Sequence, residues 1–181
     1  MRRVFVPLVL TLCLLLSGCG SAAKSRFEEF SQTLAEKTDF TFTADVRAEY
    51  QDKTAEFTIE YVRYEGGCTV TVVEPELIRG VTAHMADGKT QLEFSGVILD
   101  VGPLDEYGLT PMSSLPTLVR AMQSGHVESV RSEGGQTVVE LKPEDHLTVT
   151  VWFDEASMCP VRAEIASDGR VAVYCDLRDW S

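Results

Sequence analysis

The three histidines are the first residues to examine for catalysis or metal binding, because imidazole is both a frequent general base and a common metal ligand. They are His84, His126 and His146, and no two of them have the spacing of metal ligands on a helix. The 181-residue chain also has no Cys-x-x-Cys pair, no Gly-x-Ser-x-Gly elbow and no glycine-rich phosphate loop. We therefore expect no metal site, no cofactor and no catalytic residue, so that the protein is not an enzyme.

Carboxylates and thiols are the remaining candidates for chemistry. The 28 acidic residues are too many for the sequence to select a catalytic pair. Cys68 and Cys175 fall at strand positions that suit small buried hydrophobes, whereas a nucleophilic thiol needs a positioned base beside it. Together with Cys159 they leave two alternatives open, one disulfide pair in an oxidising compartment or buried free thiols.

The N-terminus carries the one motif with a defined chemistry. Arg2 and Arg3 precede an apolar run of about 13 residues that ends in small residues, which is the pattern of a secretory leader. The run is too short for a membrane span, which needs about 20 apolar residues. The stretch Leu16-Ser17-Gly18-Cys19 closes it and resembles the lipobox of bacterial lipoproteins.

That resemblance implies export, cleavage before Cys19 and diacylation of the Cys19 thiol. Residues 1–18 are then a lipoprotein signal peptide, and the protein is extracytoplasmic and lipid-anchored to the cell membrane. Two acyl chains anchor a protein stably where one chain is marginal. The alternative is an ordinary signal peptide in which the cysteine is coincidental. Residues 19–25 are predicted to be a lipidated tether, in which the small and polar stretch Gly20 to Lys24 reaches only about 15–20 Å when extended. Residues 26–181 are predicted to form one domain.

The charge of the predicted mature chain restricts its partners. All 28 acidic residues follow the leader but only 14 of the 16 basic ones do, which gives a formal charge near −14. Nucleic-acid binding needs clustered Lys and Arg, so we expect no nucleic-acid partner. Electrostatic docking on anionic lipid is disfavoured for the same reason, which leaves the acyl anchor as the membrane contact.

Alternation of apolar and polar residues predicts a mainly antiparallel β domain. The strands are expected over about 40–50, 55–64, 68–74, 81–86, 89–94, a remnant after 96, and then 127–132, 136–142, 147–153, 161–166 and 170–176. Asp87-Gly88 is typical of a two-residue turn that sets Met85 opposite Thr90 and His84 opposite Gln91. For the last hairpin we predict a three-residue turn at 167–169, because it sets Ile165 opposite Val171 on the buried face.

Two helices interrupt the strands. A capping box at Ser25 and apolar residues at helical spacing predict the first over about 26–37. The second is expected to begin at Ser113 or Ser114, with Pro116 in its first turn, and to end at Gly125. Four residues form its apolar stripe: Leu115, Leu118, Val119 and Met122.

This order of elements resembles the lipoprotein-carrier (LolA/LolB-like) superfamily over roughly residues 27–179. The segment 73–80 with the Asp87-Gly88-Lys89 hairpin resembles the strand–Pro–strand segment of that family, and Gly108-Leu109-Thr110-Pro111 is similar to the clostridial spore-germination lipoproteins within it. The resemblance implies a strongly curved open sheet of about 10–11 strands, a half-barrel, with the middle helix across its concave face.

Two functions follow as hypotheses. The first is a non-catalytic lipoprotein that binds a protein partner at the cell envelope or spore membrane, with spore germination as the implied process. The alternative is binding of a lipid or lipoprotein in the concave face, with Leu115, Leu118, Val119 and Met122 as candidate lining. The same four residues would equally fill a plain core, and a homodimer through the open sheet edges is a further alternative.

Overall fold

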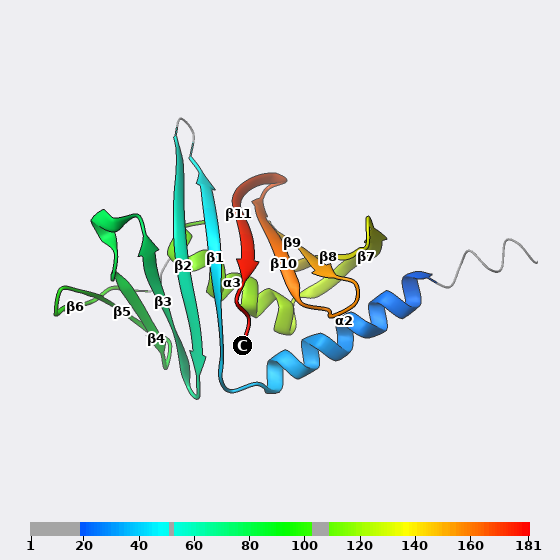
Figure 1. Cartoon of the computed structure of the whole chain (residues 1–181), viewed down its shortest axis with the longest axis horizontal. Helices are drawn as coiled ribbons and strands as arrows, with labels where there is room; N and C mark the ends of the chain where they lie inside the picture. Colours follow the sequence, from blue (N-terminus) through cyan, green and yellow to red (C-terminus); the bar gives the residue numbers. More distant parts are fainter. Residues whose placement is uncertain (1–18, 51–52, 103–108) are drawn as a thin grey trace, which may run out of the picture.

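The computed structural model describes residues 19–50, 53–102 and 109–181. Within these ranges one antiparallel sheet of 11 strands has the order β6-β5-β4-β3-β2-β1-β11-β10-β9-β8-β7 (Figure 1). Strands that follow one another pair as hairpins on either side, and β1 pairs with β11 to join the two halves. The sheet stays open, with β6 and β7 as its edges. The strands are β1 Phe40–Glu49, β2 Thr54–Tyr64, β3 Gly67–Glu74, β4 Thr82–Ala86, β5 Lys89–Phe94, β6 Val97–Asp100, β7 His126–Glu133, β8 Gln136–Glu144, β9 Leu147–Asp154, β10 Pro160–Ser167 and β11 Arg170–Arg178.

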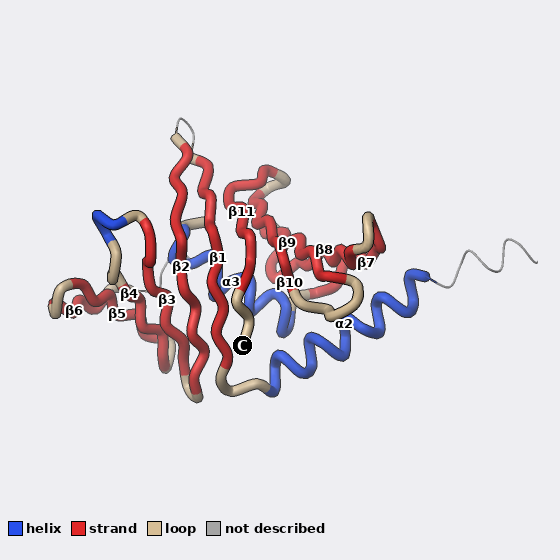
Figure 2. The backbone as a smooth tube through the Cα atoms, in the orientation of Figure 1, coloured by secondary structure: helices blue, strands red, loops and turns tan. Residues whose placement is uncertain are grey.

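Two α-helices and one short 3-10 turn complete the described chain. Helix α2 covers Cys19–Glu36, α3 covers Pro111–Ser124, and the 3-10 turn η1 covers Glu76–Ile78. Figure 2 shows the sheet curving around α3, which packs against β1, β2, β3, β8 and β10. Helix α2 packs against α3 and β7. The predicted fold class, an open curved antiparallel sheet with an N-terminal and a middle helix, is confirmed.

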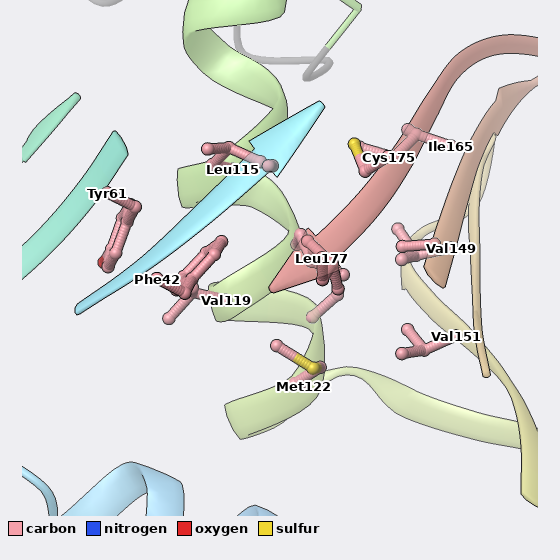
Figure 3. Packing of buried hydrophobic residues seen from close by; sticks show 14 of the residues in the cluster. Phe42, Tyr61, Leu115, Val119, Met122, Val149, Val151, Ile165, Cys175 and Leu177 are labelled. Carbon is pink, nitrogen blue, oxygen red and sulfur yellow. The ribbon is translucent and has the colours of Figure 1, made fainter. Parts of the chain in front are cut away.

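The core lies between α3 and the concave face of the sheet. The α3 residues Leu115, Leu118, Val119 and Met122 are 0–2% exposed. Figure 3 shows Leu115, Val119 and Met122 among side chains of β1, β9 and β11 such as Phe42, Val149 and Cys175. Burying a side chain of this size stabilises a fold by about 1.5–3 kcal/mol. The predicted alternation of β1 agrees with this core, since its apolar positions are buried while its polar positions are not.

The first helix begins earlier in the structure than the predicted range of about 26–37, and the assignment of residues 19–25 as a lipidated tether stays a prediction. Residues Gly20 to Lys24 are helical and belong to α2, which begins at Cys19 instead of near residue 26. Ala22 and Lys24 are good helix formers, and Ala23 is buried, so the first turns of the helix gain packing. A helix rises only about 1.5 Å per residue, which makes this segment less than half as long as an extended tether.

The ends of α3 also differ from the prediction. The N-cap is Thr110, and its hydroxyl accepts a hydrogen bond from the Ser113 amide at 3.2 Å, while the Ser113 hydroxyl reaches back to the Thr110 amide. Ser113 is thus the third helical residue and not the cap. Pro111, which has no amide hydrogen to lose, takes the first helical position. Gly125 ends the helix as predicted, although its backbone is extended (φ −67°) and not left-handed.

The predicted turn is confirmed for the β4–β5 hairpin but not for the β10–β11 hairpin. Strands β4 and β5 pair Met85 with Thr90 and His84 with Gln91, as the two-residue turn at Asp87-Gly88 predicts. The β10–β11 hairpin is different, because Ser167 pairs with Arg170 across a two-residue turn and Ile165 lies opposite Val173. A register shift between Ile165 and Ala166 keeps the apolar residues on the buried face. The predicted three-residue turn is therefore wrong.

Candidate functional site

Groups that could carry out chemistry are sparse in the part of the chain that the structure describes. No group of three or more His, Cys, Asp or Glu residues there could hold a metal ion. His84 lies on the outside of the β4–β5 hairpin, with its Nε2 atom 2.9 Å from a Glu93 carboxylate oxygen. Cys68, Cys159 and Cys175 are free thiols, so the disulfide alternative is not adopted. None of the helices in the described ranges is long and apolar enough to cross a membrane.

The predicted anchor lies at the margin of the described residues. Cys19 is the first residue of α2, and the leader up to Gly18 lies outside the described residues. Lipidation of Cys19 stays a prediction. Farther along the helix, the Arg26 guanidinium donates to the backbone carbonyls of Glu155 and Ala156 in the β9–β10 loop. These contacts fix the direction in which α2 leaves the domain, and with it the direction of any anchor.

The four predicted lining residues of α3 all lie on its buried face. Leu115, Leu118, Val119 and Met122 contact the sheet, and none of them lines either of the two surface hollows described below. The structure therefore brings the predicted set together as core packing. Their use as a ligand-binding surface stays a prediction, which requires α3 to separate from the sheet.

A hollow of about 610 Å³ opens beside α3 on the concave face, and we call it the α3 groove. One wall is the outer side of α3, and the other comes from β2, β3 and the β4–β5 hairpin. Its lining combines hydroxyls, charged side chains and two sulfur-containing residues. The residues are Arg63, Gly66, Gly67, Cys68, Met85, Ala86, Asp87, Gly88, Lys89, Thr90, Ser113, Pro116, Thr117, Arg120 and Glu144.

Arg63 is the most unusual member of the α3 groove. Its Nε atom is buried and has no hydrogen-bond partner within the described residues. The side chain lies beside Tyr61 and Cys68, which follow the same face of β2 and β3. Burial raises the pKa of both the Tyr61 hydroxyl and the Cys68 thiol, and the Arg63 charge lowers both in part. Tyr61 and Cys68 therefore stay uncharged at neutral pH and do not neutralise the guanidinium.

The second hollow, on the outer face of the sheet, has a volume of about 690 Å³ and is called the convex hollow. Asp45, Arg47 and Arg162 in its lining each have a partner nearby. Asp45 accepts hydrogen bonds from Thr58 (2.8 Å) and Arg178 (2.9 Å), Arg47 stacks on the Tyr174 ring with its guanidinium carbon 4.2 Å from the centroid, and Arg162 pairs with Glu164. These contacts leave the convex hollow without an unused cation.

The two edges of the sheet differ in what they expose. On β6, Val97, Ile98 and Leu99 are each 58–59% exposed, and their strand pairs with β5 on one side only. The exposed positions of β7 are all polar, and they include Glu128 and Arg131. Charged residues protect an edge from further pairing, whereas an apolar edge favours it.

Comparison with known proteins bears on the fold. No protein-family model and no curated protein matches the sequence. Among solved structures, an uncharacterized conserved protein from Thermus thermophilus is similar over 87% of this chain and 86% of its own, with a TM-score of 0.52 and 8% identity. The LolA superfamily protein NE2245 from Nitrosomonas europaea is similar over 84% of this chain and 92% of its own (TM-score 0.46, 12% identity). A chain of the complex between the CwlD amidase and the GerS lipoprotein of Clostridioides difficile is similar over 87% and 91% (TM-score 0.43, 13% identity).

The chain therefore shares the fold of the Thermus thermophilus protein, and its resemblance to the LolA/LolB-like superfamily stays a prediction from sequence. At these identities the likeness concerns the fold alone and assigns no residue a role. Membership of the spore-germination group stays a prediction, and of its motif Gly108–Pro111 the first residue lies outside the described residues.

Two features of this surface were not predicted from sequence, namely the inward position of Arg63 and the apolar exposure of β6, which was expected only as a strand remnant after residue 96. Arg63 continues the every-second-residue series of Phe57, Ile59 and Tyr61, so the strand period could have placed it on the concave face. β6 had no such signal, because its residues are exposed on both faces and glycines surround it.

Proposed function

We propose that this protein is a membrane-anchored, non-catalytic lipoprotein that binds a protein partner at the cell envelope or spore membrane. The observation that carries the proposal is the exposed apolar edge strand β6, with Val97, Ile98 and Leu99 more than half exposed. An extended segment of a partner can add a twelfth strand there, because the outer side of β6 pairs with no described strand. Spore germination is the process that the sequence resemblance implies.

A different protein is a better occupant of β6 than a second copy of this chain. The formal charge near −14 after the leader makes two copies repel each other at low salt. The anchor on Cys19 would restrict the search for a partner to molecules near the same membrane, which raises their effective concentration. We therefore expect a partner that has a neutral or basic edge strand and that lies near the same membrane.

Site-specific photocrosslinking in native membranes tests the proposal. A photoreactive amino acid at Ile98 is expected to give one product of defined mass, and the same group at Ser132 on β7 is the matched control. The partner identified from that product is then purified, and its binding to the full chain is expected to weaken at least about tenfold with Ile98→Lys, since an interface anchor contributes ~2 kcal/mol or more. Equal crosslinking at Ile98 and at Ser132 would contradict the proposal. A product of twice the chain mass would show that β6 binds a second copy of this chain and not a different protein.

The second candidate function is lipid or lipoprotein binding in the concave face. The observation that favours it is the α3 groove, which brings about 610 Å³ of open space to the side of α3. Native mass spectrometry of the full chain in a mild detergent tests it, and the expected result is a co-purified lipid whose retention falls with Thr117→Trp, a substitution that fills the groove. Retention that is unchanged in this variant would count against the groove as the site.

A further inference from the structure

The α3 groove is the place where the basic residues of this acidic chain gather around a hollow. Arg63, Lys89 and Arg120 line it, and only two carboxylates, Asp87 and Glu144, lie with them. The convex hollow has the opposite balance, with four carboxylates and two arginines. In a chain with a formal charge of −12, a hollow with more cations than anions is a local reversal of charge.

The three cations are not equally available. The Arg120 guanidinium lies 3.5 Å from a Glu144 oxygen, and Glu144 also has an oxygen 3.7 Å from the His146 Nε2 atom. Arg63 makes no ion pair in the described chain that would offset its charge, and its buried Nε–H has no acceptor there. An unsatisfied buried donor of a charged group destabilises the fold, so a ligand that supplies an acceptor removes that penalty.

Neutral polar groups surround this cation. Thr90 and Thr117 are buried and line the groove, where their hydroxyls are potential donors, whereas the buried Ser113 hydroxyl already donates to the Thr110 carbonyl in the helix cap. Cys68 lies beside Arg63 as a neutral thiol, because burial raises its pKa, and it therefore does not repel an anion. Met85 and Pro116 add an apolar portion to the lining.

We propose that the α3 groove is a binding site for a phosphate-type anion, with Arg63 as the main charged contact and Lys89 and Arg120 at its rim. The arginine fork suits tetrahedral oxyanions because it can donate two parallel hydrogen bonds. The anion has two sources with the same chemistry, a free phosphate or the phosphodiester of an anionic lipid headgroup. The site is separate from the β6 edge, so each proposal stands or fails without the other.

Calorimetric titration of the full chain, solubilised in an uncharged maltoside detergent, tests the site with two probes. The probes are inorganic phosphate and dihexanoyl phosphatidylglycerol. Binding of both with similar affinity supports a free-anion site, and tighter binding of the phospholipid supports a headgroup site. Binding of neither probe overturns the proposal.

Charge variants locate the anion. Arg63→Gln is expected to weaken binding by about tenfold or more, because it removes a charge-assisted contact, and Arg63→Lys is expected to retain part of the affinity. Arg131→Gln on β7 removes an equal charge far from the groove and is expected to leave binding unchanged. Glu144→Gln is expected to tighten binding, since it releases Arg120 from its ion pair. Equal affinities of Arg63→Gln and the Arg131→Gln control would overturn the proposal.

A direct readout covers the case in which Arg63→Gln does not fold. In a nitrogen-15-labelled wild-type chain, the Arg63 Nε–H resonance is expected to shift on addition of the bound probe, while that of Arg131 stays in place. Assignment of the Arg63 signal can use Arg63→Lys, which retains the charge. A bound probe that leaves the Arg63 signal unmoved would show that the anion lies elsewhere.

Discussion

The two ends of the sheet are built from the same kind of hairpin but differ in how far the two helices cover them. Strands β7–β11, with β1, lie in the half that α2 and α3 cover, and this half contains most of the buried aromatic and aliphatic side chains. The wing, defined as β4–β6, is outside the main contacts of both helices. The two helices are therefore enough to bury one half of the sheet, but they do not cover the wing.

The difference has a physical origin in the length of α3. Its 14 residues span about 21 Å at 1.5 Å per residue, whereas 11 strands at about 4.8 Å spacing are far wider than that. One helix of this length cannot cover the whole curved face. The part of the sheet that α3 does not cover contains the α3 groove and the wing. Both candidate sites, the α3 groove and the β6 edge, therefore lie beside or beyond the covered part.

The largest expected contrast between the two halves is in stability. Phe153 on β9 is fully buried, and its ring centroid lies 5.7 Å from that of Phe27 and 5.0 Å from that of Phe30 on α2. Phe153→Ala is expected to lower the free energy of unfolding by about 3–5 kcal/mol, because it leaves a cavity in the core. Leu99→Ala in the wing is expected to change it by less than about 0.5 kcal/mol.

Urea unfolding followed by circular dichroism measures both changes. The denaturant slope should stay the same in the two variants, so that a shift in midpoint reports stability alone. Similar losses in Phe153→Ala and Leu99→Ala would mean that the wing is packed as tightly as the covered half, and the comparison would then fail.

A smaller contrast is expected in the pH dependence of the two buried thiols. Burial raises the pKa of Cys175, in the covered half, to about 12, whereas an unfolded thiol ionises near pH ~8.5. The unfolded state then binds fewer protons between these values, so this contribution is fully present below pH ~8.5 and is lost as the pH rises toward ~12. By pH ~10.5 the stability lost in this way amounts to about 2–3 kcal/mol.

The measurement is the free energy of unfolding from pH 8 to about pH 10.5. Cys175→Ala should remove much of the alkaline decline. Cys68→Ala should remove less, because the Tyr61 hydrogen bond and the Arg63 charge partly oppose the effect of burial on the Cys68 thiol. If Cys68→Ala flattened the curve more than Cys175→Ala, the α3 groove would be drier than the covered core.

The cap of α3 is expected to contribute about 1 kcal/mol to the covered half. Thr110→Ala removes the hydroxyl that accepts from the Ser113 amide, and the loss in unfolding free energy should lie in the range of about 0.5–2 kcal/mol. Ser124→Ala, at the exposed end of the same helix, where the hydroxyl donates to the Arg120 carbonyl, is the matched control with a smaller expected change. An equal effect of the two substitutions would show that the cap does not anchor the helix.

The covered half could be predicted from sequence because its patterns are regular. Alternation in β1 and β9 gives one apolar face each, and the stripe of α3 is the complementary surface, so fold class and core follow from the two periodicities. The predictions that were wrong concern places where the preferred local turn competes with burial of the apolar face. The β10–β11 hairpin keeps its two-residue turn and shifts register within the strand instead, and a bulge of this kind leaves no sequence mark.

The candidate sites were harder to predict because they are exceptions to those patterns. Arg63 occupies an inward position of β2 that an apolar residue would normally take, so the apolar alternation of this strand ends at Tyr61. Thr110 was missed as a cap because Ser113 and Ser114 are equally good capping residues by type. β6 shows no alternation since neither of its faces is buried.

The smallest change in stability is expected for a substitution on β6. This substitution is also the clearest way to distinguish a binding surface from a part of the core. Ile98→Lys places a charge on an exposed edge, so the free energy of unfolding should change by less than about 0.5 kcal/mol. Binding of the dye ANS, which reports exposed apolar surface, should fall in this variant, while Ser132→Lys on the polar β7 edge should leave it unchanged. Three exposed aliphatic side chains on an edge that contributes little to folding are what the proposed docking surface requires. A large loss of stability in Ile98→Lys would instead make β6 part of the core, and the proposed docking surface would have to be abandoned.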